Sequence, residues 1–302
     1  MNKILLTGAS GFLGEILQAS LLADNYAVVG MGRHGQPLSI DITEPFQLPF
    51  QTEIDTVIHA AGKAHSVPKT AEEEKEFYDV NYQGTVNLCK AIDHLEIKPK
   101  AFIFISTVAV YGVEEGEMIA ESHPLNGITP YAKSKIEAER YLLEWSAKNH
   151  IVLSILRLPL IAGFNPPGNL GAMIHGIKTG KYLSIGKANA KKSMIWAEDI
   201  VPIIPQLAAQ GGIYNLTDGY HPTFAELEVE ISRTLGKPLP IKVSLFLARL
   251  IAKVGDLLGS KAPINTQKLN KITASLTFDD QYARRKLGWK PSNTLSKISK
   301  IV

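Results

Sequence analysis

The first half of the chain alternates short apolar runs with longer segments in which apolar residues recur at helical spacing. The apolar runs predict strands at residues 3–7, 26–31, 56–60, 101–106 and 151–156. The helical spacing predicts helices at residues 12–23, 71–95 and 131–148. Strands that are apolar throughout are buried on both faces, and their alternation with helices is typical of a parallel sheet. We therefore expect an α/β fold with a doubly wound parallel sheet.

This regularity ends near Pro159. Residues 163–170 read GFNPPGNL, a turn-rich segment that predicts a domain boundary. Short elements follow at residues 192–200 and 212–217, and the pattern is mixed after Gly219. We expect two domains. The larger has residues 1–165 plus 191–218, and a smaller, mixed C-terminal domain has residues 166–190 plus 219–302.

One segment of the smaller domain is strongly amphipathic. Residues 245–258 place Arg249 and Lys253 among apolar residues at helical spacing. Such a helix can pack on a protein core or lie on a membrane surface. We expect the first, because core-facing helices are the more common of the two.

Composition excludes several classes of protein. The chain has 302 residues, 45% of them hydrophobic and 20% charged, which is typical of a globular protein and not of a disordered or coiled-coil chain. The net charge of +3 is too balanced to indicate nucleic-acid binding. No apolar run is long enough to predict a membrane span, and the N-terminus reads as a strand and turn, not as a signal peptide. The single cysteine, Cys89, excludes an intrachain disulfide and fits a reducing compartment, so we expect a cytoplasmic protein with no metal site.

The first strand leads into a glycine-rich turn. Residues 7–14 read TGASGFLG, between a predicted strand and a predicted helix. In this context the glycines allow a tight turn, a close approach of a pyrophosphate to the backbone, and close packing of helix on strand. A plain strand–helix turn is the alternative, but it rarely needs three glycines. The turn predicts a Rossmann-type dinucleotide site in the larger domain, with cofactor-binding residues Gly8, Ser10, Gly11, Phe12, Leu13 and Gly14.

The end of the second strand bears on the choice of cofactor. An NAD site usually has an acidic residue there for the ribose hydroxyls, but here Arg33 follows the strand and the first acid is Asp41. A guanidinium suits a 2′-phosphate, so we favour NADP, with NAD as the alternative. The less favoured alternative for Arg33 is a solvated loop residue.

A second set of residues has the chemistry of proton transfer. Tyr131 and Lys135 are four residues apart on a predicted helix and share one face. A neighbouring ammonium favours the phenolate, so we expect it to lower the pKa of Tyr131. Thr107 follows a buried strand, where open α/β sheets place their ligands. Standing alone, its hydroxyl would be expected to bond local backbone.

These motifs together carry a family resemblance. TGASGFLG, His59-Ala-Ala-Gly62, Asp79-Val-Asn81, ISTVAVYG, YAKSK and Leu287-Gly-Trp289-Lys-Pro291 occur in that order. The chain resembles the extended short-chain dehydrogenase/reductase family, in its nucleotide-sugar epimerase/dehydratase branch. The resemblance implies that Tyr131 donates and accepts a proton, that Lys135 holds the nicotinamide ribose, and that Thr107 is the accompanying hydroxyl.

The resemblance also implies roles around the cofactor and the substrate. Asp41 and Ile42 would lie by the adenine, and Asn81 would support the site. Three residues would pass under the cofactor, Ala60, Ala61 and Gly62, and Pro159 would lie against the nicotinamide. Asn169, in the smaller, substrate-binding domain, and Lys192, in the last part of the larger domain, match positions that meet a nucleotide diphosphate. Asn169 could instead only make its turn, and Lys192 could be a solvated surface residue.

The resemblance narrows the reaction to hydride transfer at carbon 4 of a nucleotide-diphosphate sugar. A 4,6-dehydratase carries an acidic pair after the threonine, but here Val108 and Ala109 stand there, which argues against that activity. Residues 156–186 and 192–200 look most like UDP-4-keto-N-acetylhexosamine reductases of bacterial surface-polysaccharide pathways. We therefore expect an NAD(P)-dependent 4-keto reductase acting on a UDP-sugar.

Other functions stay open at this point. A UDP-sugar 4-epimerase is the close alternative, because it can use the same Thr107, Tyr131 and Lys135. A steroid- or flavonoid-type reductase and an inactive binding protein of the same fold are less favoured. Members of the family often form dimers through the helices predicted here at residues 71–95 and 131–148, which implies a homodimer.

Overall fold

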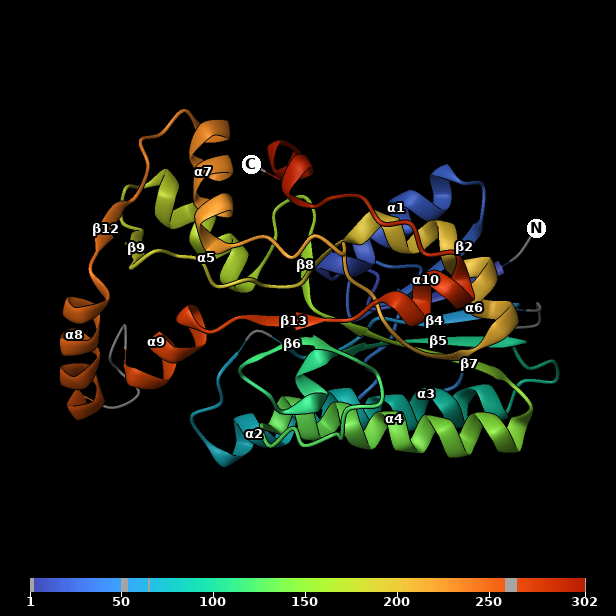
Figure 1. Ribbon diagram of the computed structural model, residues 1–302. Coiled ribbons are helices and arrows are strands. Elements are labelled where there is room, and N and C mark those ends of the chain that lie inside the picture. The colour runs from blue at the N-terminus through green and yellow to red at the C-terminus, as the bar shows by residue number, and fades with distance from the viewer. Residues whose placement is uncertain (1–2, 50–53, 65, 259–264, 302) are drawn as a thin grey trace.

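A parallel sheet of seven strands forms the centre of the molecule in a computed structural model that describes residues 3–49, 54–64, 66–258 and 265–301 (Figure 1). The strands run in the order β11-β7-β5-β4-β1-β2-β3, and each neighbouring pair is parallel. Their bounds are β1 Lys3–Thr7, β2 Ala27–Gly32, β3 Leu38–Ser39, β4 Thr56–His59, β5 Ala101–Thr107, β7 Val152–Leu158 and β11 Gly212–Asn215. The predicted doubly wound α/β fold is confirmed.

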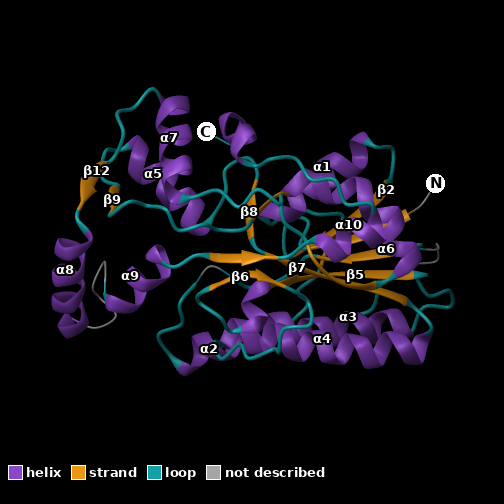
Figure 2. Ribbon diagram, in the orientation of Figure 1, coloured by secondary structure: helices purple, strands orange, loops and turns teal. Residues whose placement is uncertain are grey.

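Helices cover both faces of this sheet (Figures 1 and 2). One face carries α1 (Phe12–Ala23), α6 (Ile204–Gln210) and α10 (Gln281–Leu287). The other carries α2 (Ala71–Tyr78), α3 (Gly84–Asp93) and α4 (Pro130–Asn149). Because both faces are covered, the central strands are apolar throughout, and every residue of β5 is buried.

The helix predicted at residues 71–95 is interrupted. Between α2 and α3, residues Asp79–Gln83 form a π-helical turn. Such turns are frequent at functional sites. Here the turn buries Asn81, and the contacts that its side chain makes are described below.

The smaller lobe is built from short elements. It contains α5 (Gly168–Lys178), α7 (Phe224–Leu235), α8 (Leu245–Leu258), α9 (Thr266–Thr273) and the pair β9 (Leu183–Ile185) with β12 (Ile241–Val243). Two further pairs join the lobe to the main sheet, β8 (Leu160–Ala162) with β10 (Met194–Trp196) and β6 (Gly116–Ile119) with β13 (Leu276–Phe278). Within the described residues, 3-10 helices are also found at Val108–Tyr111, Ala197–Ile203 and Leu295–Lys300.

Two expectations about this lobe are corrected. The turn-rich segment at residues 163–170 is not a loop to its end, because α5 already begins at Gly168. The helix at residues 245–258 forms as predicted, but its bulky residues do not face a core. Ala248 and Ala252 are buried, whereas Phe246 and Val254 are exposed. Within the described residues, no helix is both long and apolar enough to cross a bilayer.

Candidate active site

The turn between β1 and α1 has no room for side chains at its glycines. Gly8 has a φ of +68°, and a Cβ there would lie 2.6 Å from the backbone nitrogen of Ala61. A Cβ on Gly14 would lie 2.0 Å from the carbonyl oxygen of Gly8. Gly11 caps α1 without any side chain, so the first N–H groups of the helix stay open to a ligand. A cradle of this shape fits a pyrophosphate; its remaining residues are exposed Ser10, half-buried Phe12 and buried Leu13.

The end of β2 lies beside this turn. A Cβ on Gly32 would lie 2.8 Å from the hydroxyl oxygen of Ser10, and the exposed Arg33 comes next in the chain. Hydrogen bonds from Thr43 lower the pKa of Asp41, and the charge of Arg33 lowers it further. Arg33 and Asp41 therefore stand within electrostatic reach of each other at the predicted adenosine end. Ile42 is buried, and its carbonyl oxygen accepts a hydrogen bond of 2.9 Å from the Asn87 side chain.

A buried chain of hydrogen bonds fixes the floor of the cradle. The hydroxyl of Thr85 donates to the Asn81 carbonyl at 2.7 Å, so the Nε2–H of His59 donates to Thr85 at 2.9 Å. The other ring nitrogen of His59 lies 2.6 Å from the Thr7 hydroxyl, which accepts from the Ala61 N–H at 3.2 Å. Burial lowers the pKa of His59 to about 3, so the ring is neutral at physiological pH. This neutral ring fixes the segment that contains Ala60, Ala61 and Gly62.

Asn81 connects that segment to α4. Its side-chain oxygen accepts from the Lys63 N–H at 2.7 Å, and its nitrogen donates to the Lys63 carbonyl at 3.1 Å and to the Ser134 hydroxyl at 3.0 Å. Ser134 precedes Lys135 in α4. The amide thus supports the site through the loop and the helix, the kind of role that the resemblance implies.

The structure brings Tyr131 and Thr107 together. α4 begins after Thr129, whose hydroxyl accepts from the Ala132 N–H at 3.2 Å, and this cap sets Tyr131 in the first turn. Burial beside the Phe77 ring, 6.1 Å away between centroids, raises the pKa of Tyr131, while a hydrogen bond with Thr107 acts to lower it. The expected lowering of the pKa by Lys135 is wrong for the protein without a ligand. The phenol is therefore protonated at neutral pH.

The Lys135 ammonium is directed elsewhere, which explains the difference. Its Nζ donates to the Ile105 carbonyl at 2.9 Å and lies 4.5 Å from the centroid of the Phe104 ring. Burial lowers its pKa to about 8, and the charge of Glu139 acts to raise it. A Cβ on Gly62 would lie 3.2 Å from this nitrogen, so Lys135 borders the segment under the predicted cofactor.

Sequence reasoning missed a buried ion pair behind these residues. Glu139 and Arg157 are 1% and 4% exposed in their side chains, and their closest charged atoms are 2.7 Å apart. Ser106 also donates to Glu139, and Arg157 donates to the Tyr111 hydroxyl at 3.2 Å. One signal was present, because Glu139 continues the four-residue spacing of Tyr131 and Lys135. Its partner, in β7, could not be assigned from spacing.

The two predicted substrate residues, Asn169 and Lys192, do not bond to each other in the structure. Asn169 is exposed near the start of α5, whose N-cap, Pro167, offers no side-chain cap. Lys192 donates from Nζ to the Lys271 carbonyl at 3.0 Å, and burial lowers its pKa while Glu114 acts to raise it. No hydrogen bond between Asn169 and Lys192 is found in the described part of the chain. Pro159 is half-buried between β7 and β8.

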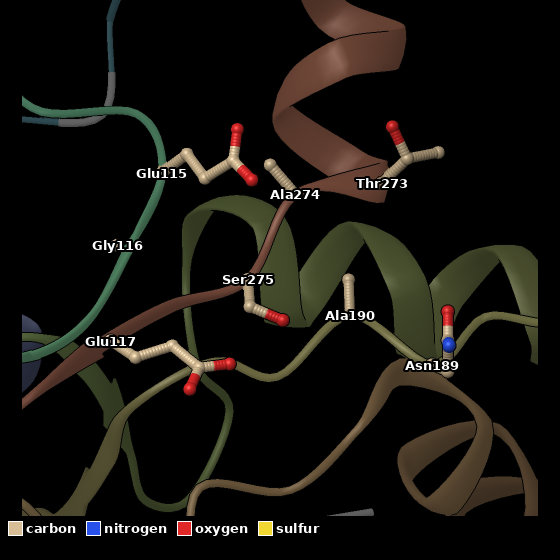
Figure 3. A pocket seen from close by; sticks show the side chains of 8 residues that line it. All are labelled: Glu115, Gly116, Glu117, Asn189, Ala190, Thr273, Ala274 and Ser275. Atoms are coloured by element: carbon tan, nitrogen blue, oxygen red, sulfur yellow. The ribbon is translucent and has the colours of Figure 1, made fainter.

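A cavity of about 380 Å³ lies where β6 meets the smaller lobe (Figure 3). Its lining includes the carboxylates of Glu115 and Glu117 and the Ser275 hydroxyl. Two carboxylates would repel a diphosphate. The cavity borders the predicted anion site, because the Lys191 N–H donates to the Ser275 hydroxyl and Lys192 pairs with Leu276, but its carboxylates do not favour a diphosphate.

Curated relatives extend over most of the chain. The chain is 30% identical to the N-acetyl-alpha-D-glucosaminyl-diphospho-ditrans,octacis-undecaprenol 4-epimerase of Escherichia coli O157:H7, covering 92% of this chain and 87% of the relative. It is 30% identical to a UDP-glucose 4-epimerase of Vibrio cholerae, covering 98% and 93%. It is 28% identical to a GDP-6-deoxy-D-mannose reductase of Pseudomonas aeruginosa, covering 75% and 78%.

Solved structures share the fold. A UDP-glucuronic acid 4-epimerase from Bacillus cereus in complex with NAD matches with a TM-score of 0.75 and 20% identity, over 99% of this chain and 97% of that one. RMD from Pseudomonas aeruginosa complexed with NADPH matches with a TM-score of 0.74 and 21% identity, over the same shares.

A family model settles the assignment that the motifs suggested. The model of the NAD dependent epimerase/dehydratase family matches residues 4–217, which include the glycine turn, Thr107, Tyr131 and Lys135. Both the matched span and the relatives over nearly the full length agree with the fold. The chain belongs to the NAD-dependent epimerase/dehydratase family and is an NAD(P)-dependent enzyme of the extended short-chain dehydrogenase type.

Proposed function

We propose that this protein is an NADP-dependent reductase that acts at the 4-keto group of a nucleotide-diphosphate sugar, with a UDP-sugar as substrate. The observation that carries the proposal is the Tyr131 phenol. It is hydrogen-bonded to Thr107 at the carboxyl edge of the sheet, and burial raises its pKa. A phenol that stays protonated at neutral pH is ready to give a proton, which is what the reduction of a carbonyl requires.

In the proposed reaction, Tyr131 and its neighbours Thr107 and Lys135 have separate roles. When bound, the nicotinamide supplies the hydride. Tyr131 donates its proton to the carbonyl oxygen at carbon 4, and Thr107 orients that oxygen through its hydroxyl. Lys135 holds the nicotinamide ribose, and its ammonium, once turned from the Ile105 carbonyl, stabilises the phenolate that proton donation leaves behind.

The preference for NADP rests on the end of β2. Arg33 is exposed there. Gly32, which precedes it, lies against Ser10 of the glycine turn. A guanidinium can bind a 2′-phosphate with two parallel hydrogen bonds. Asp41 is the nearest acid along the chain, eight residues after Arg33, and its Oδ1 accepts from the Thr43 N–H at 3.0 Å and from the Thr43 hydroxyl at 2.8 Å. An NAD site usually has its acid directly at the end of the second strand.

The proposed diphosphate site combines the start of α5 in the smaller lobe with Lys192, which lies just before β10. The uncapped start of α5 offers backbone N–H groups beside Asn169, and the Lys192 ammonium would supply the charge. Lys192 has to leave the Lys271 carbonyl to do so. The names of the relatives support a sugar diphosphate as substrate, since one relative is a UDP-glucose 4-epimerase and another is a 4-epimerase of a sugar diphosphate carried by a polyprenol.

A 4-epimerase is the second candidate, because two of the relatives described above are 4-epimerases over nearly the full chain. One experiment separates the two. Purified protein is denatured, any released nucleotide is identified by mass spectrometry, and fresh protein is assayed with a UDP-4-keto-sugar and NADPH. Stoichiometric oxidation of NADPH by a protein that was purified without nucleotide supports the reductase. Tightly held NAD, with conversion of a UDP-sugar to its 4-epimer and no net oxidation, overturns it.

The predicted homodimer through α2, α3 and α4 stays a prediction. Leu143 is 47% exposed on α4 and would lie in such an interface. Sedimentation equilibrium of the wild type and of Leu143→Glu would test it.

A further inference from the structure

The outer face of α8 is an exposed apolar surface. Six bulky side chains of the helix are between 47% and 88% exposed, and we call them the α8 patch: Phe246, Leu247, Leu250, Ile251, Val254 and Leu257. Leu239 and Ile241, just before the helix, are also exposed, at 59% and 72%. Exposed apolar surfaces of this extent mark sites of interaction with a protein or a membrane.

The orientation of α8 is the reverse of that of a core helix. At about 100° per residue, the α8 patch occupies one arc of the helix, and Ala248, Ala252 and Gly255 lie on the other side. These small residues are buried, and the two alanines pack with Leu269 of α9. The helix thus contacts the protein through its small residues and Leu245, which packs on the same cluster, and turns the six residues of the α8 patch away from it.

The charges beside the patch are positive. Arg249 and Lys253 lie next to one edge of the apolar arc, and Lys242 is exposed on β12. The acid of the helix, Asp256, is turned to α9, where it accepts from the Thr266 N–H at 2.9 Å and from its hydroxyl at 2.6 Å. A large apolar arc bordered by cations is the pattern of helices that lie in the interface of an anionic bilayer.

We propose that the α8 patch docks this protein on the surface of an anionic lipid bilayer, with α8 lying in the membrane plane. The helix of 14 residues is too short to span a bilayer. The two cations at the edge of the arc, Arg249 and Lys253, complement the charge of an anionic bilayer, which is why we commit to a lipid surface and not to a protein partner. The proposal does not depend on the proposed reaction.

Docking in this way would orient the whole enzyme. α8 lies at the end of the molecule toward which the carboxyl ends of the sheet strands point, on the side of the smaller lobe (Figures 1 and 2). The substrate lobe would therefore lie next to the lipid surface, and the opposite end of the sheet would lie away from it. A sugar carried on a lipid diphosphate and a soluble nucleotide sugar would then approach the site by different routes.

Co-sedimentation with vesicles tests the proposal. The full chain is mixed with vesicles of phosphatidylcholine alone or of phosphatidylcholine with phosphatidylglycerol. We expect binding to the anionic vesicles and at least about tenfold weaker binding of Phe246→Glu/Leu250→Glu, because the double variant places two charges in the apolar arc. Leu22→Glu/Ile97→Glu is the matched control, since those residues are 53% and 55% exposed outside α8. It should bind like the wild type.

A second variant separates charge from apolar contact. Arg249→Gln/Lys253→Gln should lose about tenfold or more of its affinity for the anionic vesicles and retain its weak binding to phosphatidylcholine. Far-ultraviolet circular dichroism and thermal unfolding show that each variant is folded. Wild-type protein that stays in the supernatant with both kinds of vesicle overturns the proposal. So does a dimer in sedimentation equilibrium that Phe246→Glu/Leu250→Glu dissociates while vesicle binding is absent, because a second copy then covers the patch.

Discussion

Strand β5 and helix α8 are both built largely from apolar residues, but they use them in opposite ways. β5 buries every residue from Ala101 to Thr107 between two layers of helices, whereas α8 buries Ala248 and Ala252 and exposes Phe246 and Leu250. An apolar pattern states which positions avoid water. The pattern does not show what covers these positions. In α8, the rest of the protein leaves the side chains of the α8 patch exposed.

The same contrast holds for the polar residues of the two regions. In the sheet domain the polar side chains near the site are buried and paired, as Glu139 is with Arg157. The predicted substrate residues are more open, because Asn169 is exposed in the smaller lobe and half-buried Lys192, just before β10, donates from its ammonium to the Lys271 carbonyl. We therefore expect substitutions in the sheet domain to lower stability or turnover more than matched substitutions elsewhere lower stability or ligand affinity.

The largest expected effect is on turnover. Tyr131→Phe removes the proposed proton donor and should lower kcat by about two to four orders of magnitude, the usual contribution of positioned acid–base catalysis. Binding of NADPH should be nearly unchanged, since the glycine cradle and Lys135 remain. Steady-state kinetics and a binding titration measure the two separately. Turnover close to that of the wild type would exclude Tyr131 from the mechanism.

Next is the buried ion pair. Glu139→Gln leaves the Arg157 guanidinium buried without its counter-charge and should lower the free energy of unfolding by about 3–5 kcal/mol. Glu230→Gln in α7 is the matched control, because its pairing with Arg233 is exposed and should contribute less than about 1 kcal/mol. Denaturant unfolding measures both. Equal losses in the two variants would contradict the contrast between the regions.

Glu139→Gln should also change the pH dependence of cofactor affinity. Lys135 has a pKa of about 8, so its ammonium is present below that pH and is lost above it. Cofactor affinity should therefore fall as the pH rises through about 8. Because Glu139 acts to raise this pKa, Glu139→Gln should move the fall to lower pH. Calorimetric titrations of NADPH across this range test the shift, and an unmoved midpoint would show that Lys135 is not the titrating group.

Glycines of the two regions give a third comparison. Gly8→Ala places a Cβ against Ala61 at a positive φ, and should cost about 2–5 kcal/mol from strain and overpacking together. Gly236→Ala, at the end of α7, has a similar φ of +60° but no atom within 4 Å of the new Cβ. It should cost only the strain, about 1–2 kcal/mol. Thermal unfolding compares them, and a larger loss at Gly236 would contradict the tight cradle.

The smallest of these effects is expected at the substrate side. Lys192→Gln should weaken UDP binding about tenfold, since one charge-assisted hydrogen bond contributes about 1.5–3 kcal/mol and Lys192 must first leave the Lys271 carbonyl. The turnover of bound sugar should change less, because the contact is remote from carbon 4. Lys191→Gln, at the exposed neighbouring residue, is the control. Calorimetry with UDP that shows no difference would remove Lys192 from the diphosphate site.

The sequence predicted the local parts of this molecule well. Local sequence determines the glycine turn, the adjoining β1 and α1, and the shared helical face of Tyr131 and Lys135. Each of these features depends on neighbours within a few residues, so its motif predicts its geometry. The pairing of Glu139 with Arg157 was missed, because only the packing of α4 on β7 brings the two together. For the protein without a ligand, the pKa of Tyr131 was predicted in the wrong direction, since spacing cannot show that the Lys135 ammonium turns to the Ile105 carbonyl. The same limit applies to α8, whose amphipathic pattern is equally compatible with a core and with another surface.

We propose above all that the carboxyl ends of β1 and β2 hold an NADP cofactor. Titration of the wild type and of Arg33→Ala with NADPH and NADH by calorimetry tests it most directly. We predict that the wild type binds NADPH about tenfold or more tightly than NADH, because the guanidinium bonds the 2′-phosphate, and that Arg33→Ala binds the two alike. A wild type that binds NADH severalfold more tightly, or that binds neither nucleotide, would contradict the account.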